Sequence, residues 1–198
     1  IRPHGRGPGE WLGITDFTVD ETDREIIVTA DRPYKFLYYD YNGNFLREKT
    51  SEAFYTEITR TTDNILAINS KVLEPKHYLS LLNEEDHRIT VAKKIPLAFT
   101  YRGEFRCRGS YLLKSEHLYF TQNGDYTIYS WDNNRIKPVV TVDFGKYSYN
   151  PTQLNEEPHA PATRNKVLSI INVKEIRSNL FFNTNKIGLF VYNKTRHQ

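Results

Sequence analysis

The glycines near the start of the sequence have the spacing of a phosphate-binding loop. Gly5, Gly7 and Gly9 alternate with other residues, and such a loop holds phosphate when a strand precedes it and a helix N-terminus follows it. Here Pro8 removes one backbone N–H donor, and the residues from Thr15 onward have the pattern of a strand rather than a helix. The sequence therefore favours a structural turn.

Two acidic segments, residues 20–23 and 40–44, resemble parts of calcium-binding loops. A complete loop needs alternating oxygen ligands and a distal bidentate glutamate, and neither segment supplies them. Aspartate and asparagine are also common in hairpins for backbone reasons. We therefore predict no metal site and no cofactor.

The residues that most often act in catalysis show no arrangement typical of an active site. The six histidines lack the spacings that place two imidazoles on one face, and no Gly-x-Ser-x-Gly motif marks a nucleophile. The single cysteine, Cys107, lies between two arginines, but a partly buried strand-end cysteine is the commoner outcome. We predict no catalytic residue.

The composition indicates a globular β protein. Of 198 residues, 38% are hydrophobic and 26% charged, and the chain contains 14 Tyr and 11 Phe, residue types that suit a pleated, half-buried surface. The net charge of +3 is spread along the sequence, which argues against a nucleic-acid partner. No apolar run approaches the roughly 18 residues of a membrane helix.

Short strand-like runs recur in groups along the chain. The first group, residues 15–50, has four runs, with Arg32-Pro33 between the second and third and the hairpin dipeptide Asn42-Gly43 before the fourth. Similar groups lie near residues 54–95, 111–144 and 169–198, the last without a fourth run. Repeats of roughly 40 to 45 residues with four strands are typical of β-propeller blades. A two-sheet sandwich is the alternative.

The second run of each group is almost continuously apolar, as in residues 65–68 and 118–120. Strands that are buried on both faces have this pattern. It favours sheets packed face to face against their neighbours, as blades are.

Several motifs together resemble a known family, the six-bladed β-propeller proteins common in Bacteroidetes. These motifs are GRGPGEW at 5–11, YDYNGNF at 39–45, PVVTVDFGKY at 138–147, VKEI at 173–176 and LFF at 180–182. The resemblance implies a propeller related to NHL-repeat proteins, exported or lipid-anchored on the cell envelope, with no catalytic residues to carry over. About four of an expected six blades are visible, so residues 1–198 are expected to form a single but incomplete propeller domain.

The loops between second and third strands are expected to gather at one end of the blades. We expect aromatic and charged side chains there to bind a glycan, peptide or protein; they are Arg32, Tyr34, Lys71, His77, Asn123, Asp125 and Lys186. The predicted function is therefore a binding propeller. The alternatives are a glycan-active lyase or hydrolase, which would need two carboxylates about 5 to 9 Å apart, and an architectural module with an apolar surface patch.

Overall fold

The computed structural model describes residues 4–51, 53–68, 79–83, 111–115, 117–122, 125–132, 135–148, 165–186 and 188–196, together with the backbone of 88–93. Apart from one 3-10 turn at Gly145–Tyr147, the regular elements in these segments are strands. The strands of the first half are β1 (Ile14–Asp20), β2 (Glu25–Asp31), β3 (Tyr34–Asp40), β4 (Phe45–Thr50), β5 (Glu57–Arg60), β6 (Ile65–Ile68), β7 (Leu79–Leu82) and β8 (Arg88–Lys93). Those of the second half are β9 (Leu112–Lys114), β10 (Leu118–Gln122), β11 (Asp125–Asp132), β12 (Arg135–Thr141), β13 (Ile170–Ile176), β14 (Asn179–Thr184) and β15 (Leu189–Asn193).

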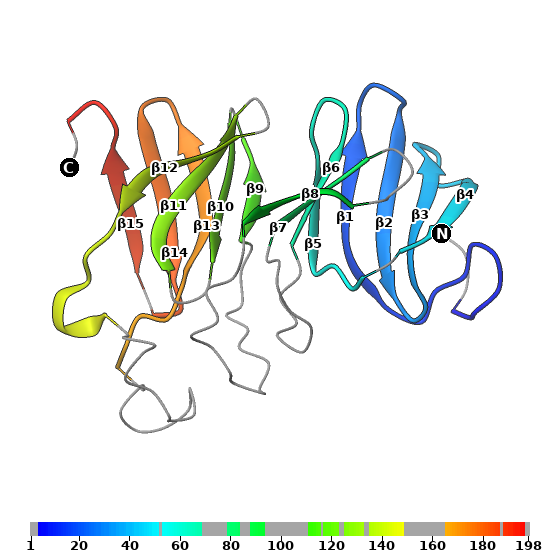
Figure 1. Cartoon of the computed structure of the whole chain (residues 1–198), viewed down its shortest axis with the longest axis horizontal. Helices are drawn as coiled ribbons and strands as arrows, with labels where there is room; N and C mark the ends of the chain where they lie inside the picture. The colour runs from blue at the N-terminus through cyan, green and yellow to red at the C-terminus, as the bar shows by residue number, and fades with distance from the viewer. Residues whose placement is uncertain are drawn as a thin grey trace. The chain divides into compact units, whose positions relative to one another are not determined.

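The strands form antiparallel meanders, each hydrogen-bonded in sequence order (Figure 1). The chain divides into two compact units, Ile1–Ile95 and Pro96–Gln198. Unit 1 contains the sheets β1–β4 and β5–β8, and unit 2 contains the sheets β9–β12 and β13–β15. The predicted grouping of strands is therefore confirmed, including the three-stranded last group. Whether residues 1–198 form one propeller domain stays a prediction.

One predicted strand is too long. The sequence pattern extends the last strand of the third group to Phe144, but β12 ends at Thr141. The chain turns there because Gly145 has a positive φ of 54°. The backbone N–H of Gly145 also donates a hydrogen bond to Asp143 Oδ1 at 2.7 Å. The apolar residues Val142 and Phe144 instead pack on the core of unit 2.

The core of unit 1 lies between its two sheets. Phe36, Tyr38 and Ile27 of the first sheet pack with residues of the second sheet, among them Ile58 and Leu82. All five are at most 4% exposed. Burial of this apolar surface, at about 25 cal/mol per Å² removed from water, is what holds the sheets face to face.

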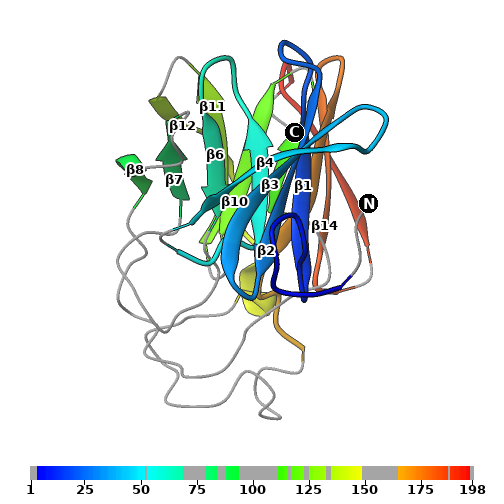
Figure 2. The ribbon, with the colours of Figure 1, turned by 90° about the vertical axis from the view of Figure 1, so that its right-hand side faces the viewer.

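The glycine-rich segment covers the other face of the first sheet (Figure 2). Trp11 packs there on a cluster that includes Val28 and Tyr39. The backbone N–H of Gly7 donates to Glu10 at 2.8 Å, and that of Gly9 donates to Glu48 at 2.7 Å. Two of the amides that a phosphate would need are thus bound by the protein's own carboxylates, which confirms the structural turn.

The core of unit 2 has the same plan. Tyr119 and Ile128 of the third sheet pack against the fourth sheet, in particular Ile170, Leu180 and Phe182. The predicted burial of second strands on both faces holds for β6 and β10, whose described residues are all buried. It is wrong for β14, where buried and partly exposed residues alternate.

Candidate ligand-binding site

A polar pocket of about 160 Å³ opens in unit 1 between the sheets β1–β4 and β5–β8. It lies at the end of the sheets that carries the β1–β2 turn, because its residues come from the end of β1, the start of β2 and the end of β5. Three acidic, three basic and three buried uncharged side chains line it: Asp20, Asp23, Glu25, Arg47, Lys49, Arg60, Ile27, Tyr38 and Ile65.

The floor of the pocket is part of the core. Ile27, Tyr38 and Ile65 belong to the cluster that joins the two sheets, and each is at most 4% exposed. These side chains cannot move without disturbing the packing of both sheets. The pocket therefore has a rigid, mainly apolar base.

The β1–β2 turn places the acidic side chains on one side. Asp20 Oδ1 accepts hydrogen bonds from the backbone N–H groups of Thr22, at 2.9 Å, and Asp23, at 3.2 Å. This arrangement is a common aspartate-stabilised turn. It orients Asp20 Oδ2 toward β5, where Arg60 Nε lies 2.6 Å away.

Arg47 crosses the first sheet above Tyr38. Its guanidinium donates two hydrogen bonds to Glu25, at 2.5 and 2.8 Å, and its central carbon lies 4.0 Å from the centre of the Tyr38 ring. The hydrogen bonds from Arg47 to the Glu25 carboxylate raise the pKa of Arg47, and the nearby charge of Asp23 adds to the effect. Because the fork of an arginine fits a carboxylate in the plane, this pair fixes the geometry of the pocket mouth.

The pocket combines balanced charge with small size. Acids come from β1, β2 and their turn, whereas bases come from β4 and β5. Pockets that enclose drug-sized ligands measure about 300–1,000 Å³, so this pocket has room for a single sugar or amino-acid residue. Balanced charges favour a ligand that is neutral overall and can both donate and accept hydrogen bonds.

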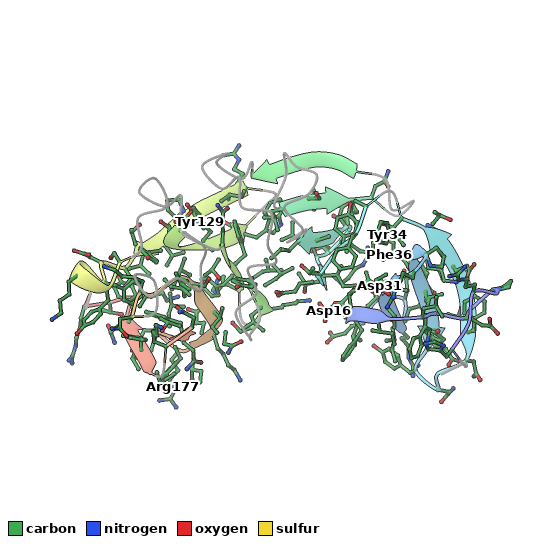
Figure 3. All side chains as sticks on the ribbon, turned by 90° about the horizontal axis from the view of Figure 1, so that it is seen from below. Asp16, Asp31, Tyr34, Phe36, Tyr129 and Arg177 are labelled. Carbon is green, nitrogen blue, oxygen red and sulfur yellow. The ribbon has the colours of Figure 1, made fainter. Side chains whose placement is uncertain are left out.

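The residues predicted from the sequence in unit 1 lie elsewhere. Arg32 and Tyr34 adjoin the β2–β3 turn, at the opposite end of the first sheet from the pocket. Arg32 contacts its neighbour Asp31, and the Tyr34 ring packs on Phe54 with ring centres 5.6 Å apart. Figure 3 shows Tyr34 in the same region as Asp31 and Asp16. Whether this end binds a ligand stays a prediction.

In unit 2 the structure brings two predicted loops to one end. Thr121, near the end of β10, donates a hydrogen bond to the carbonyl of Ile170 at 2.7 Å, and Ile170 pairs with Thr184 at the end of β14. The turns beside Asp125 and Lys186 therefore lie at the same end of this unit. That proximity agrees with the predicted gathering of loops.

Asp125 already has a structural role. Its carboxylate accepts hydrogen bonds from the Thr127 backbone, at 2.9 Å, and from the Tyr129 hydroxyl, at 2.8 Å. The remaining predicted residues Lys71, His77 and Asn123 lie outside the described residues, as does Cys107. A ligand role for them stays a prediction.

Sequence reasoning missed the basic side of the pocket. Arg47 and Arg60 are separated from their acidic partners by 22 and 40 positions, and no local spacing signals those pairs. The one available signal was the acidic β1–β2 turn, residues 20–23, which resembled part of a calcium loop. The structure shows that Asp20 stabilises the turn and binds Arg60.

Unit 2 contains a second polar cluster around Glu175, whose side chain is 1% exposed. It accepts hydrogen bonds from His117 Nδ1 at 2.7 Å and the Tyr119 hydroxyl at 2.8 Å, and it pairs with Lys194. Because the carboxylate is on β13 and two of its partners adjoin β10, the cluster joins the third and fourth sheets. In the described part of the chain, no three His, Cys, Asp or Glu side chains gather as a metal site would require.

Comparison with known protein families shows which family the chain belongs to. A family model described as "Domain of unknown function (DUF4934)" matches residues 1–198. The chain belongs to this family. No curated protein matches the DUF4934 chain.

Solved structures support the fold. A Bacteroides fragilis protein described as exported aligns with 98% of the DUF4934 chain, and the alignment covers 59% of the Bacteroides fragilis chain. The two share 19% sequence identity, and the TM-score is 0.68. BamB of Moraxella catarrhalis aligns with 93% of the DUF4934 chain over 48% of the BamB chain, with 12% identity and a TM-score of 0.53. An auxiliary nutrient binding protein of Bacteroides thetaiotaomicron aligns with 95% of the DUF4934 chain over 40% of its own chain, with 11% identity and a TM-score of 0.51.

At these identities the likeness shows the fold alone, and it confirms an all-β chain of blade-like antiparallel sheets of the β-propeller class. The DUF4934 chain spans less than two thirds of each of these three solved chains. Among the described residues, no helix is long and apolar enough to cross a membrane.

Proposed function

We propose that the chain is a ligand-binding portion of an exported β-propeller of the bacterial cell envelope, and that the pocket of unit 1 binds one small polar residue. The observation that carries the proposal is the pocket itself, in which six charged side chains surround a rigid apolar floor. Such a combination of apolar contact and convergent polar groups is typical of small-molecule sites.

The similar proteins support the setting. One solved neighbour is described as exported and another as an auxiliary nutrient binding protein. Together with the sequence resemblance to envelope propellers, they favour a role in capturing a ligand outside the cytoplasm. The complete protein would then include further blades, up to the six that the resemblance implies.

Binding is favoured over the glycan-active alternative by the state of the pocket carboxylates. Asp20 and Glu25 are each paired with an arginine, at 2.6 and 2.5 Å. A general acid must instead be free to contact the reacting atoms of the substrate, and these two carboxylates are already bound by arginines of the protein. The pair geometry suits recognition better than acid–base chemistry.

The test is a binding screen of the 198-residue chain by isothermal titration calorimetry, with single sugars and single amino acids as probes. Arg47→Ala opens the pocket mouth, and Arg32→Ala is the matched control at the opposite end of the sheet. We expect a ligand whose affinity falls at least tenfold with Arg47→Ala and is unchanged by Arg32→Ala. Binding that depends on Arg32 and not on Arg47 would overturn the proposed site.

A further inference from the structure

Arg60 is a nearly buried cation whose hydrogen-bonding capacity is mostly unused. Its side chain is 12% exposed, and its contact with Asp20 is through Nε. That contact lacks the direction of a hydrogen bond, so Nε is a buried donor without an acceptor. The two terminal amino groups form no hydrogen bond with the residues that the structure describes. A guanidinium has five N–H donors, and the four on the terminal amino groups are open to water or to a ligand in the pocket that Arg60 lines.

The terminal amino groups of Arg60 are suited to one kind of ligand group. Their planar fork matches the two oxygens of a carboxylate, which accepts both N–H groups in parallel. Because Arg60 lines the pocket, a carboxylate entering the pocket would reach these donors. The ion pair with Asp20 limits the excess positive charge of Arg60, so a strongly charged anion gains less here than a single carboxylate.

Asp23 supplies the complementary feature. Its carboxylate lines the pocket, is exposed, and makes no hydrogen bond with another described residue. Only its backbone N–H is used, as a donor to Asp20. The side chain is thus available to accept hydrogen bonds from an ammonium group, which has three donors.

The apolar floor of Ile27, Tyr38 and Ile65 lines the same pocket as these two groups. A ligand with one carboxylate, one ammonium and a small branched apolar side chain would satisfy all three parts of the pocket. A neutral sugar would leave the Arg60 donors facing hydroxyl groups and would place polar atoms against the apolar floor, which costs binding free energy.

We infer that the pocket of unit 1 binds a zwitterionic α-amino acid with an aliphatic side chain, with its carboxylate at Arg60 and its ammonium at Asp23. The inference rests on the proposed ligand-binding function and specifies its ligand. The size of the pocket, about 160 Å³, agrees with a single such residue.

Titration calorimetry with four probes tests the ligand class. L-leucine carries both charges, N-acetyl-leucine lacks the ammonium, leucinamide lacks the carboxylate, and glucose represents a sugar. We expect L-leucine to bind and each leucine derivative to bind roughly 10- to 100-fold more weakly, the loss that follows from one missing charged hydrogen-bonded group.

Two variants test the contacts. Arg60→Lys keeps the charge but removes the fork, and Asp23→Asn alters an exposed side chain that the fold does not need. Each should weaken L-leucine binding about tenfold or more. Arg135→Lys, in unit 2, and Asp63→Asn are the matched controls outside the pocket, and they should leave binding unchanged. If Arg60→Lys does not fold, as shown by circular dichroism, Asp23→Asn decides.

The outcomes separate this inference from the proposed function. If glucose or another sugar binds in a manner sensitive to Arg47→Ala while L-leucine does not, the pocket is a binding site and the amino-acid inference is overturned. Binding of L-leucine that ignores both Arg60→Lys and Asp23→Asn also overturns it. No binding by any sugar or amino acid would overturn the proposed function as well.

Discussion

Asp16 of β1 accepts a hydrogen bond from the backbone N–H of Ile58 on β5, with Asp16 Oδ2 2.8 Å from the Ile58 nitrogen. This bond joins β1 and β5, the first strands of the two sheets of unit 1, at the core residue Ile58. Burial raises the pKa of Asp16, although hydrogen bonds from the Ile58 and Phe17 backbones act in the opposite direction.

The first prediction concerns the pH dependence that follows. Because the pKa of Asp16 is higher in the folded state, the folded chain binds this proton more tightly than the unfolded chain. Asp16 therefore costs stability as the pH rises from the ordinary value of 3.8 through the folded pKa. Urea unfolding between pH 3.5 and 7 measures the free energy of unfolding of both proteins. As the pH rises, the value for Asp16→Asn should increase relative to the value for the wild type.

Asp16→Ala is the control for that experiment. It removes the acceptor as well as the charge and leaves the Ile58 N–H without a partner, so it should destabilise by about 1–3 kcal/mol. Equal pH profiles for wild type and Asp16→Asn would contradict the role of burial.

The second prediction concerns Gly9, whose φ is 72° and whose added Cβ would lie 3.1 Å from the Phe45 ring. Gly9→Ala should destabilise through both the backbone conformation and this close contact. Gly145→Ala is matched, because Gly145 also has a positive φ, of 54°, but its Cβ would have no atom within 4 Å. We expect thermal unfolding to show a loss of about 1–2 kcal/mol for Gly145→Ala and roughly 1 kcal/mol more for Gly9→Ala.

The third prediction concerns Lys35, a lysine only 4% exposed that binds Glu48 at 2.9 Å and the Gly7 carbonyl at 3.3 Å. Although burial acts in the opposite direction, hydrogen bonds from Gly9 and Lys35 lower the pKa of Glu48. Glu48→Ala removes the partner of a buried ammonium and should cost about 2–4 kcal/mol. Lys35→Met combined with Glu48→Ala should recover part of the loss in urea unfolding.

Lys35→Met alone completes the comparison. If the losses of unfolding free energy in Lys35→Met and in Glu48→Ala add up to the loss in the double variant, Lys35 and Glu48 do not act as a pair. The expected coupling free energy is about 1–2 kcal/mol.

The fourth prediction concerns the Glu175 cluster of unit 2. Tyr119→Phe removes one hydrogen bond, of 2.8 Å, and should cost about 1–2 kcal/mol. Glu175→Gln also removes the charge that faces Lys194 and should cost about 3 kcal/mol. If chemical denaturation ranks these two variants in the opposite order, the carboxylate is not what holds the two sheets together.

Much of the fold followed from local patterns. The Asn42-Gly43 dipeptide predicted a tight turn, and Gly43 has a φ of 81°, between β3 and β4. Apolar runs such as residues 65–68 predicted a strand buried on both faces, and β6 is buried throughout. These features depend on neighbouring residues, whose backbone preferences and burial leave a regular trace in the sequence.

The pocket depended on contacts between distant residues. Arg47 meets Glu25 across the intervening strand β3, and Arg60 meets Asp20 from a different sheet. The amino-acid sequence by itself determined the strands, their order and the structural role of the glycine turn. Only the tertiary structure decided which charged side chains meet, because packing one sheet on the next joins residues that no local spacing relates.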